Sequence, residues 1–157
     1  MAIPKKIINF LNKSKIKYKI LEHKTVYTAF DKSQTLKVDP KIVGKTLILK
    51  GDRNLKVVLT PANKNLDLKK FKKLGKFKKV DFVSEKEIKK KFKGVKVGAI
   101  PPFGNLWKFQ TFVEKSILKE KEVILNGGDW NFSIKINPKD LKNLIPDLVI
   151  GNIAKAK

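Results

Sequence analysis

The sequence predicts one α/β (α+β) domain with a mixed, mostly antiparallel sheet and several helices. Three observations support the mixed, mostly antiparallel sheet: short apolar segments with strand-like patterning, several segments with a helical apolar face, and glycine- or asparagine-rich turns between neighbouring strands. A chain of 157 residues fits a single domain, 1–157, whose core needs no disulfide or structural metal.

The N-terminal segment predicts a helix followed by a strand. The helix begins near Pro4 and ends near Lys15, because three apolar residues fall on one helical face, at Ile7, Ile8 and Leu11. Beyond it, apolar residues alternate with lysines and predict a half-buried strand, at Ile16, Tyr18 and Ile20.

The next segment predicts a short helix and then a hairpin. Asp31 is expected to cap a helix that ends near Leu36, and Asp39-Pro40 opens a further turn. Two apolar strands follow, at 45–50 and 55–60, and the polar turn 51–54 joins them as a hairpin. Both strands are therefore expected to be antiparallel neighbours.

The middle of the chain alternates between helix and strand. Residues 66–74 present a helical apolar face, and 80–83 predicts a short strand. Ser84 and Glu87 have capping-box spacing at the start of another helix, which Gly94 ends.

The C-terminal half predicts three more strands and a final helix. The strands fall at 109–113, 122–125 and 132–136, and Asn126-Gly127-Gly128 connects the last two. Asn137-Pro138 begins a helix that reaches about Ile145. The several hairpins make the sheet mostly antiparallel.

Charge is the strongest compositional feature. The formal net charge is +23 at pH 7, and Arg53 is the only arginine. Such a field attracts polyanions such as RNA, and lysine acts as a point charge on the backbone rather than as a reader of bases. A lysine bias of the whole organism would give the same charge, so charge alone leaves the partner open.

The residue inventory excludes several kinds of catalysis. Cysteine is absent and His23 is the only histidine, so neither a thiol nucleophile nor the usual zinc ligand set is available. No Gly-x-Ser-x-Gly elbow accompanies the histidine. No apolar stretch approaches the ~20 residues of a membrane span. We therefore expect a cytoplasmic protein that acts without metal or cofactor.

Gly44-Lys45-Thr46 looks like the end of a phosphate-binding P-loop, but two features exclude that motif. Asp39 stands where the motif requires another glycine, and the residues after Thr46 predict a strand instead of a helix.

Two other features suit hydrolysis by positioning. The loop 98–104 combines glycine, which permits close backbone approach, with prolines that fix its shape, so its amides could face a developing oxyanion. Lys45 begins an apolar strand and could direct its amine into a cleft.

In order and spacing, five segments together resemble the YbaK/ProX family of aminoacyl-tRNA deacylases, related to the editing domain inserted in bacterial prolyl-tRNA synthetases. The matching segments are 21–28, 43–50, 60–62 together with 66–70, the loop 98–104 and 126–128. The resemblance extends from about Pro4 to Ile153. It implies the fold of that editing domain, a curved, barrel-like mixed sheet flanked by helices, and hydrolysis of the ester between an amino acid and tRNA.

The resemblance also implies a site. Its lysine falls on Lys45, which would hold the substrate, and its Gly-x-x-x-Pro loop falls on Gly98 and Pro102, with Ala99 inside the loop. The implied substrate-binding residues are Tyr27, Phe30, Thr46, Thr60, Ile100, Pro101, Pro102, Asn126 and Ser133. Ala99, Pro101 and Ser133 depart from residues common in relatives, which leaves the preferred amino acid open.

The expected substrate is the acceptor end of a tRNA charged with a small amino acid, alanine or cysteine on tRNA for proline first, and prolyl-tRNA synthetase is a suggested partner. A hydroxyl of the terminal ribose would assist proton transfer, so that the protein need only orient and stabilise the ester. The alternatives are a non-catalytic RNA-binding module of the same fold and a basic domain with no nucleic-acid role.

Overall fold

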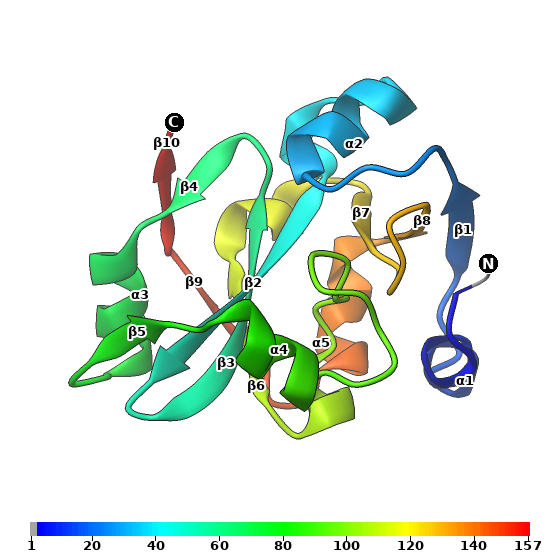
Figure 1. Cartoon of the computed structure of the whole chain (residues 1–157). Helices are drawn as coiled ribbons and strands as arrows, with labels where there is room; N and C mark the ends of the chain where they lie inside the picture. The colour runs from blue at the N-terminus through cyan, green and yellow to red at the C-terminus, as the bar shows by residue number, and fades with distance from the viewer. Residues whose placement is uncertain (1–2) are drawn as a thin grey trace.

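The computed structural model describes residues 3–157, which form short helices packed around three hydrogen-bonded sheets (Figure 1). The helices are α1 (Lys5–Lys13), α2 (Ala29–Leu36), α3 (Leu68–Gly75), α4 (Glu85–Lys91) and α5 (Leu141–Leu144). The strands are β1 (Tyr18–Glu22), β2 (Gly44–Gly51), β3 (Asn54–Pro61), β4 (Lys64–Leu66), β5 (Val80–Phe82), β6 (Gln110–Glu114), β7 (Val123–Asn126), β8 (Phe132–Ile136), β9 (Val149–Gly151) and β10 (Ala154–Ala156).

The sheets have the orders β5-β2-β3-β6-β9, β1-β8-β7 and β10-β4. Five strand pairings are antiparallel and two, β3–β6 and β6–β9, are parallel. A parallel bridge between Val43 and Ile124 links the entry of β2 to β7. The mixed, mostly antiparallel architecture is as predicted, and within residues 3–157 the strands divide among three sheets.

The local predictions differ from the structure mainly at element ends. Thr28, not Asp31, caps α2, because its hydroxyl accepts the Asp31 amide at 3.1 Å. The helix expected from 66 starts only at Leu68, and the residues before it form β4. Ser84 caps α4 as predicted, while the Glu87 carboxylate pairs with Lys50 at 2.9 Å. The expected final helix is a 3₁₀ turn, Pro138–Asp140, followed by the single turn α5.

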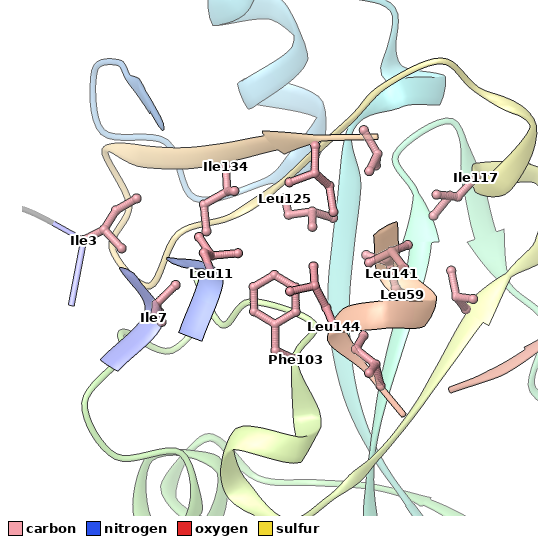
Figure 2. Packing of buried hydrophobic residues seen from close by; sticks show 14 of the residues in the cluster. Ile3, Ile7, Leu11, Leu59, Phe103, Ile117, Leu125, Ile134, Leu141 and Leu144 are labelled. Carbon is pink, nitrogen blue, oxygen red and sulfur yellow. The ribbon is translucent and has the colours of Figure 1, made fainter. Parts of the chain in front are cut away.

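The main core lies between α1, α5 and the sheet β1-β8-β7 (Figure 2). Leu11 from α1, Leu141 from α5 and Ile134 from β8 meet there, and each is fully buried. A second apolar cluster, which includes Phe71 of α3 and Phe112 of β6, packs α3 against the large sheet. Burying a side chain of this size stabilises the fold by roughly 1.5–3 kcal/mol.

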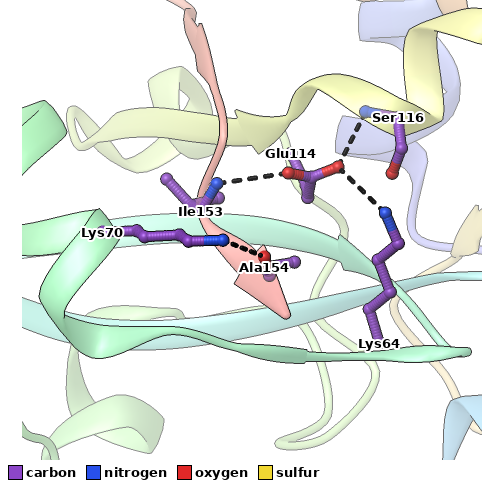
Figure 3. Close-up of polar contacts among 6 residues, drawn as sticks. All are labelled: Lys64, Lys70, Glu114, Ser116, Ile153 and Ala154. Carbon is purple, nitrogen blue, oxygen red and sulfur yellow. Dashed lines mark hydrogen bonds and ion pairs between the residues drawn. The ribbon is translucent and has the colours of Figure 1, made fainter. Parts of the chain in front are cut away.

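A buried carboxylate fastens the C-terminal strand to the sheet. Glu114, at the end of β6, accepts the amides of Ile153 at 3.2 Å and Ser116 at 2.8 Å, and the Lys64 amine lies 4.0 Å away (Figure 3). Lys70 of α3 also donates to the Ala154 carbonyl at 3.1 Å. These contacts fix the β10–β4 pair, and β4 in turn touches the site described next.

Candidate functional site

One cavity of about 270 Å³ brings together segments that are distant in the sequence. It lies between β2, the segment that enters α2, the loop that begins at Gly98, and the connection from β7 to β8. Its lining residues are Val26, Tyr27, Thr28, Ala29, Lys32, Lys45, Thr46, Leu47, Gly98, Ala99, Asn126, Asp129 and Trp130. Lys45 and the start of the glycine–proline loop, Gly98 and Ala99, thus line the same cavity.

Lys45 is held in place by strand pairing and by one hydrogen bond. It lies opposite Thr60 in the β2–β3 ladder, and its amine donates to the Lys64 carbonyl of β4 at 2.7 Å. Burial, and to a smaller degree the charge of Lys157, holds the pKa of Lys45 below its usual value. A Cβ added to the preceding residue, Gly44, would lie 2.7 Å from a methyl carbon of Leu59, so a larger residue there would require that side chain to move.

The Gly98–Pro102 loop offers fewer free amides than the sequence suggests. Gly98 has φ +87°, a conformation that glycine adopts without strain. The Ala99 amide already donates to the Lys96 carbonyl at 3.0 Å, so it is not free for an oxyanion. Within residues 3–157 the Gly98 amide makes no hydrogen bond. Within the same residues the amide of the buried Ile100 also has no acceptor, but of the two only Gly98 lines the cavity, so Gly98 is the candidate loop donor.

The prolines act behind the cavity instead of lining it. Pro101 and Pro102 are buried, and the Pro102 carbonyl accepts the Thr111 hydroxyl and the Gly104 amide, both at 2.9 Å. Ile100 is also buried and lines a neighbouring apolar groove of about 410 Å³. Thr46 and Gly98 line both spaces, which makes the groove and the cavity adjoin.

Asn126 is the best-fixed polar group of the cavity. Its amide nitrogen donates to the Ile100 carbonyl at 3.1 Å, and its side-chain oxygen accepts the amine of Lys32 at 2.8 Å. Lys32 is only 5% exposed, and desolvation lowers its pKa from 10.5 to about 8. The sequence analysis missed Lys32 because lysine is common everywhere in the chain. Its helical spacing from Ala29 and Leu36 places it on the inward face of α2.

Asp129 and Trp130 were also missed. Asp129 is the only acidic residue in the cavity lining, and one of its carboxylate oxygens accepts the Trp130 amide at 2.8 Å. The Trp130 indole donates to the Val97 carbonyl at 3.0 Å, and its ring packs edge-on against Tyr27 with centroids 5.2 Å apart. Tyr27 is 67% exposed, so the two rings form the rim of the cavity.

Besides Ile100 and the two prolines, three more predicted substrate-binding residues lie outside the lining, Phe30, Thr60 and Ser133. Phe30 is exposed on α2, and Thr60 is fully buried between strands. Ser133 is 0% exposed, with its hydroxyl 2.9 Å from Nε2 of His23. The other ring nitrogen of His23 lies 2.8 Å from the Lys24 carbonyl. A fully buried hydroxyl cannot meet a substrate, so this pair serves the fold.

Within residues 3–157, no group of three potential metal-ligating side chains occurs. None of the helices described there is long and apolar enough to cross a membrane.

Comparison with solved structures shows how widely this fold recurs. The hypothetical protein APE2540 superposes with a TM-score of 0.84 at 21% identity, covering 96% of this chain and 99% of its own. A candidate trans-editing enzyme for prolyl tRNA synthetase gives 0.82 at 20% identity, covering 97% and 96%. A candidate signal transduction protein from Marinobacter aquaeolei VT8 gives 0.71 at 16% identity, with 98% of this chain matching 31% of that longer one.

A family model described as the aminoacyl-tRNA editing domain matches residues 23–144, which include every residue of the cavity lining. This match confirms the resemblance found in the sequence. The chain belongs to the aminoacyl-tRNA editing domain family.

Proposed function

We propose that this protein is a trans-acting deacylase that hydrolyses the ester of a tRNA mischarged with a small amino acid. Alanine or cysteine on tRNA for proline is the first substrate to test. The observation that supports the proposal is the meeting of Lys45, Gly98 and Asn126 in one cavity, inside the segment that matches the family.

The size of the cavity favours a small aminoacyl group. At about 270 Å³ it falls below the ≈ 300–1,000 Å³ of most small-molecule pockets. It can therefore admit the aminoacyl end of the substrate and part of the ribose, while the rest of the tRNA stays outside. Discrimination by exclusion suits such a space, because one methylene changes binding by only about 1–3 kcal/mol.

The reaction needs an oriented ester, a water molecule and a stabilised oxyanion. Water adds to the ester carbonyl, the bond from carbon to the ribose oxygen breaks, and the amino acid leaves as a carboxylate while tRNA regains its hydroxyl. In this proposal the Gly98 amide donates to the developing oxyanion. The Lys45 amine, already fixed by the Lys64 carbonyl, holds the terminal nucleotide, and the free ribose hydroxyl relays the proton.

Asp129 supplies the charge that an α-ammonium group requires. Although the chain contains 37 lysines and arginines, the ion pairs among residues 3–157 do not include Asp129. In the proposed complex its carboxylate accepts the α-ammonium of the substrate, which orients the carbonyl inside the cavity.

Outside the cavity, the lysine-rich surface attracts the tRNA backbone without reading its sequence. Since such binding releases counterions, tRNA affinity should fall steeply as salt rises.

The test is a deacylation panel in which each small amino acid is mounted on a non-cognate tRNA. We expect release above the buffer rate for at least one small amino acid, and no inhibition by EDTA. Salt-sensitive tRNA binding with no release from any member would instead identify a non-catalytic RNA-binding module. Adding prolyl-tRNA synthetase to the same panel tests whether it is a partner.

A further inference from the structure

We propose that the amine of Lys32 donates a hydrogen bond to the carbonyl oxygen of the aminoacyl ester, as a second cationic contact beside Lys45. The inference rests on the proposed function and assigns a substrate contact to a residue outside the motifs that identify the family.

The first observation is a buried amine with spare donors. Lys32 is 5% exposed, and its Nζ donates to the side-chain oxygen of Asn126 at 2.8 Å. An ammonium has three donors, and no other acceptor is bonded to this one within residues 3–157. Nor does any of the ion pairs described for that range include Lys32.

An ammonium in this position normally has a carboxylate partner. Burying an unpaired charge is unfavourable, and proteins usually offset it with an ion pair or several hydrogen bonds. Here desolvation is the cause of the lowered pKa of Lys32, and no neighbouring carboxylate offsets it. The missing acceptor is therefore expected to come from a ligand that enters the cavity.

The second observation is the hydrogen bonding that fixes the Lys32 amine. Asn126 donates to the Ile100 carbonyl at 3.1 Å and accepts the Lys32 amine at 2.8 Å, so it connects that amine to the loop that begins at Gly98. Gly98, on the same cavity lining, has the unused amide. An amine with spare donors and an amide without an acceptor, both in the lining of one cavity, can together donate to an oxyanion.

The carbonyl oxygen fits this site better than a phosphate does. A phosphate stays hydrated and needs room, whereas the cavity measures about 270 Å³ and Lys32 lies in its wall almost out of reach of solvent. The carbonyl is neutral in the ground state and gains negative charge only as water adds. A donor in a dry site stabilises that new charge far more than one in water.

The titratable groups around Lys32 are few. Lys45 and Asp129 share the cavity lining, and His23 lies close enough for the charge of Lys32 to lower its pKa. Two cations and one carboxylate therefore surround the space that the aminoacyl group would fill, and the carboxylate is available for the α-ammonium.

The experiment compares two ligands that differ only in the amide group. The first is 3′-alanylamino-3′-deoxyadenosine, a non-hydrolysable amide analogue of the substrate end. The second replaces the amide by its fluoroalkene isostere, which has the same shape but is a poor acceptor. The wild type should bind the amide at least about tenfold more tightly, as expected for a hydrogen bond to a charged group.

Lys32→Met should abolish the preference for the amide ligand over the fluoroalkene ligand, whereas Lys32→Arg should keep part of it. Lys37→Met is the matched control, because Lys37 is an exposed lysine at the end of the same helix. The Lys37→Met variant should keep the full preference for the amide ligand. On a mischarged tRNA, Lys32→Met should lower kcat by about 10²–10³-fold, as for the loss of an oxyanion donor.

The outcomes separate this inference from the proposed function. A wild type that hydrolyses tRNA, together with a Lys32→Met variant of unchanged kcat and ligand preference, overturns the Lys32 contact alone. A wild type with neither turnover nor analogue binding overturns the deacylase proposal and this inference with it. Equal losses in Asn126→Ala and Lys32→Met, with no loss of ligand preference in either, would show that Lys32 only positions Asn126.

Discussion

The buried charge of Lys32 predicts a stability change with a defined pH dependence. In the folded protein its pKa falls from 10.5 to about 8, because burial disfavours the charged form. Each pKa unit corresponds to about 1.4 kcal/mol, so at neutral pH the charge destabilises the fold by about 3 kcal/mol. Lys32→Met removes this penalty, although it also leaves the Asn126 side-chain oxygen without its donor.

The sign of the pH effect follows from proton binding. Between pH 8 and 10.5 the unfolded chain keeps its proton at this lysine while the folded chain loses it. The wild-type free energy of unfolding therefore increases as the pH rises through this range. Below pH 8 both states are protonated and the penalty is fully present. The stability advantage of Lys32→Met should therefore shrink by about 2.5 kcal/mol between pH 7 and pH 10.

Urea unfolding of both proteins at several pH values measures this difference. Subtracting the wild type removes the contribution of the other lysines, since their titration is the same in both chains. Lys37→Met, which changes an exposed lysine, should show a flat difference. A flat difference for Lys32→Met as well would show that Lys32 titrates normally in the folded protein, and the argument from burial would be refuted.

Three further predictions concern other residues. Lys45→Ala should remove most deacylase activity in a single-turnover assay while far-ultraviolet circular dichroism stays unchanged, and turnover at the wild-type rate would show that the lysine is wrongly assigned. Asp129→Asn should raise KM for aminoacyl-tRNA and leave KM for N-acetyl-aminoacyl-tRNA unchanged, because only the former has an α-ammonium; equal effects on both would exclude that contact. Glu114→Gln should lower the free energy of unfolding by about 1–3 kcal/mol at pH 7 by weakening the hydrogen bonds to Ile153 and Ser116. These bonds hold the Glu114 pKa below 4.5 although its burial acts to raise it, so the difference should vanish as acid titration passes that folded pKa, and a pH-independent difference would contradict this cause.

The predicted elements with long apolar patterns appear where the sequence places them. The β2–β3 hairpin has two eight-residue strands with alternating or continuous apolar residues, joined by a polar turn. This local pattern predicts the hairpin without knowledge of tertiary contacts. The rejection of a P-loop at Lys45 is confirmed, since the residue lies in a strand. The strands β4, β9 and β10 have three residues each, too few to show a period, and they form only because the core positions their partners.

Tertiary contacts also explain which features of the site the sequence did not predict. Local sequence placed Lys45 and Gly98 near a ligand, but whether the Ala99 amide is free depends on the Lys96 carbonyl, which the turn brings back to it. Lys32 looked like any surface lysine, because its burial results from the packing of α2 over β7. Such tertiary contacts decide which of many identical side chains face the cavity.

The central claim is that the cavity between β2, α2 and the Gly98 loop binds the aminoacylated ribose. The most direct measurement is a nitrogen-15 NMR titration with 3′-alanylamino-3′-deoxyadenosine. We predict the largest shifts at the amides of Gly98, Asn126 and Asp129, with no change in α3. A separate groove is lined by residues 14–19, 121–122 and 135–137. If the largest shifts occur there, or if no saturable shifts occur anywhere, the aminoacylated ribose does not bind in the cavity.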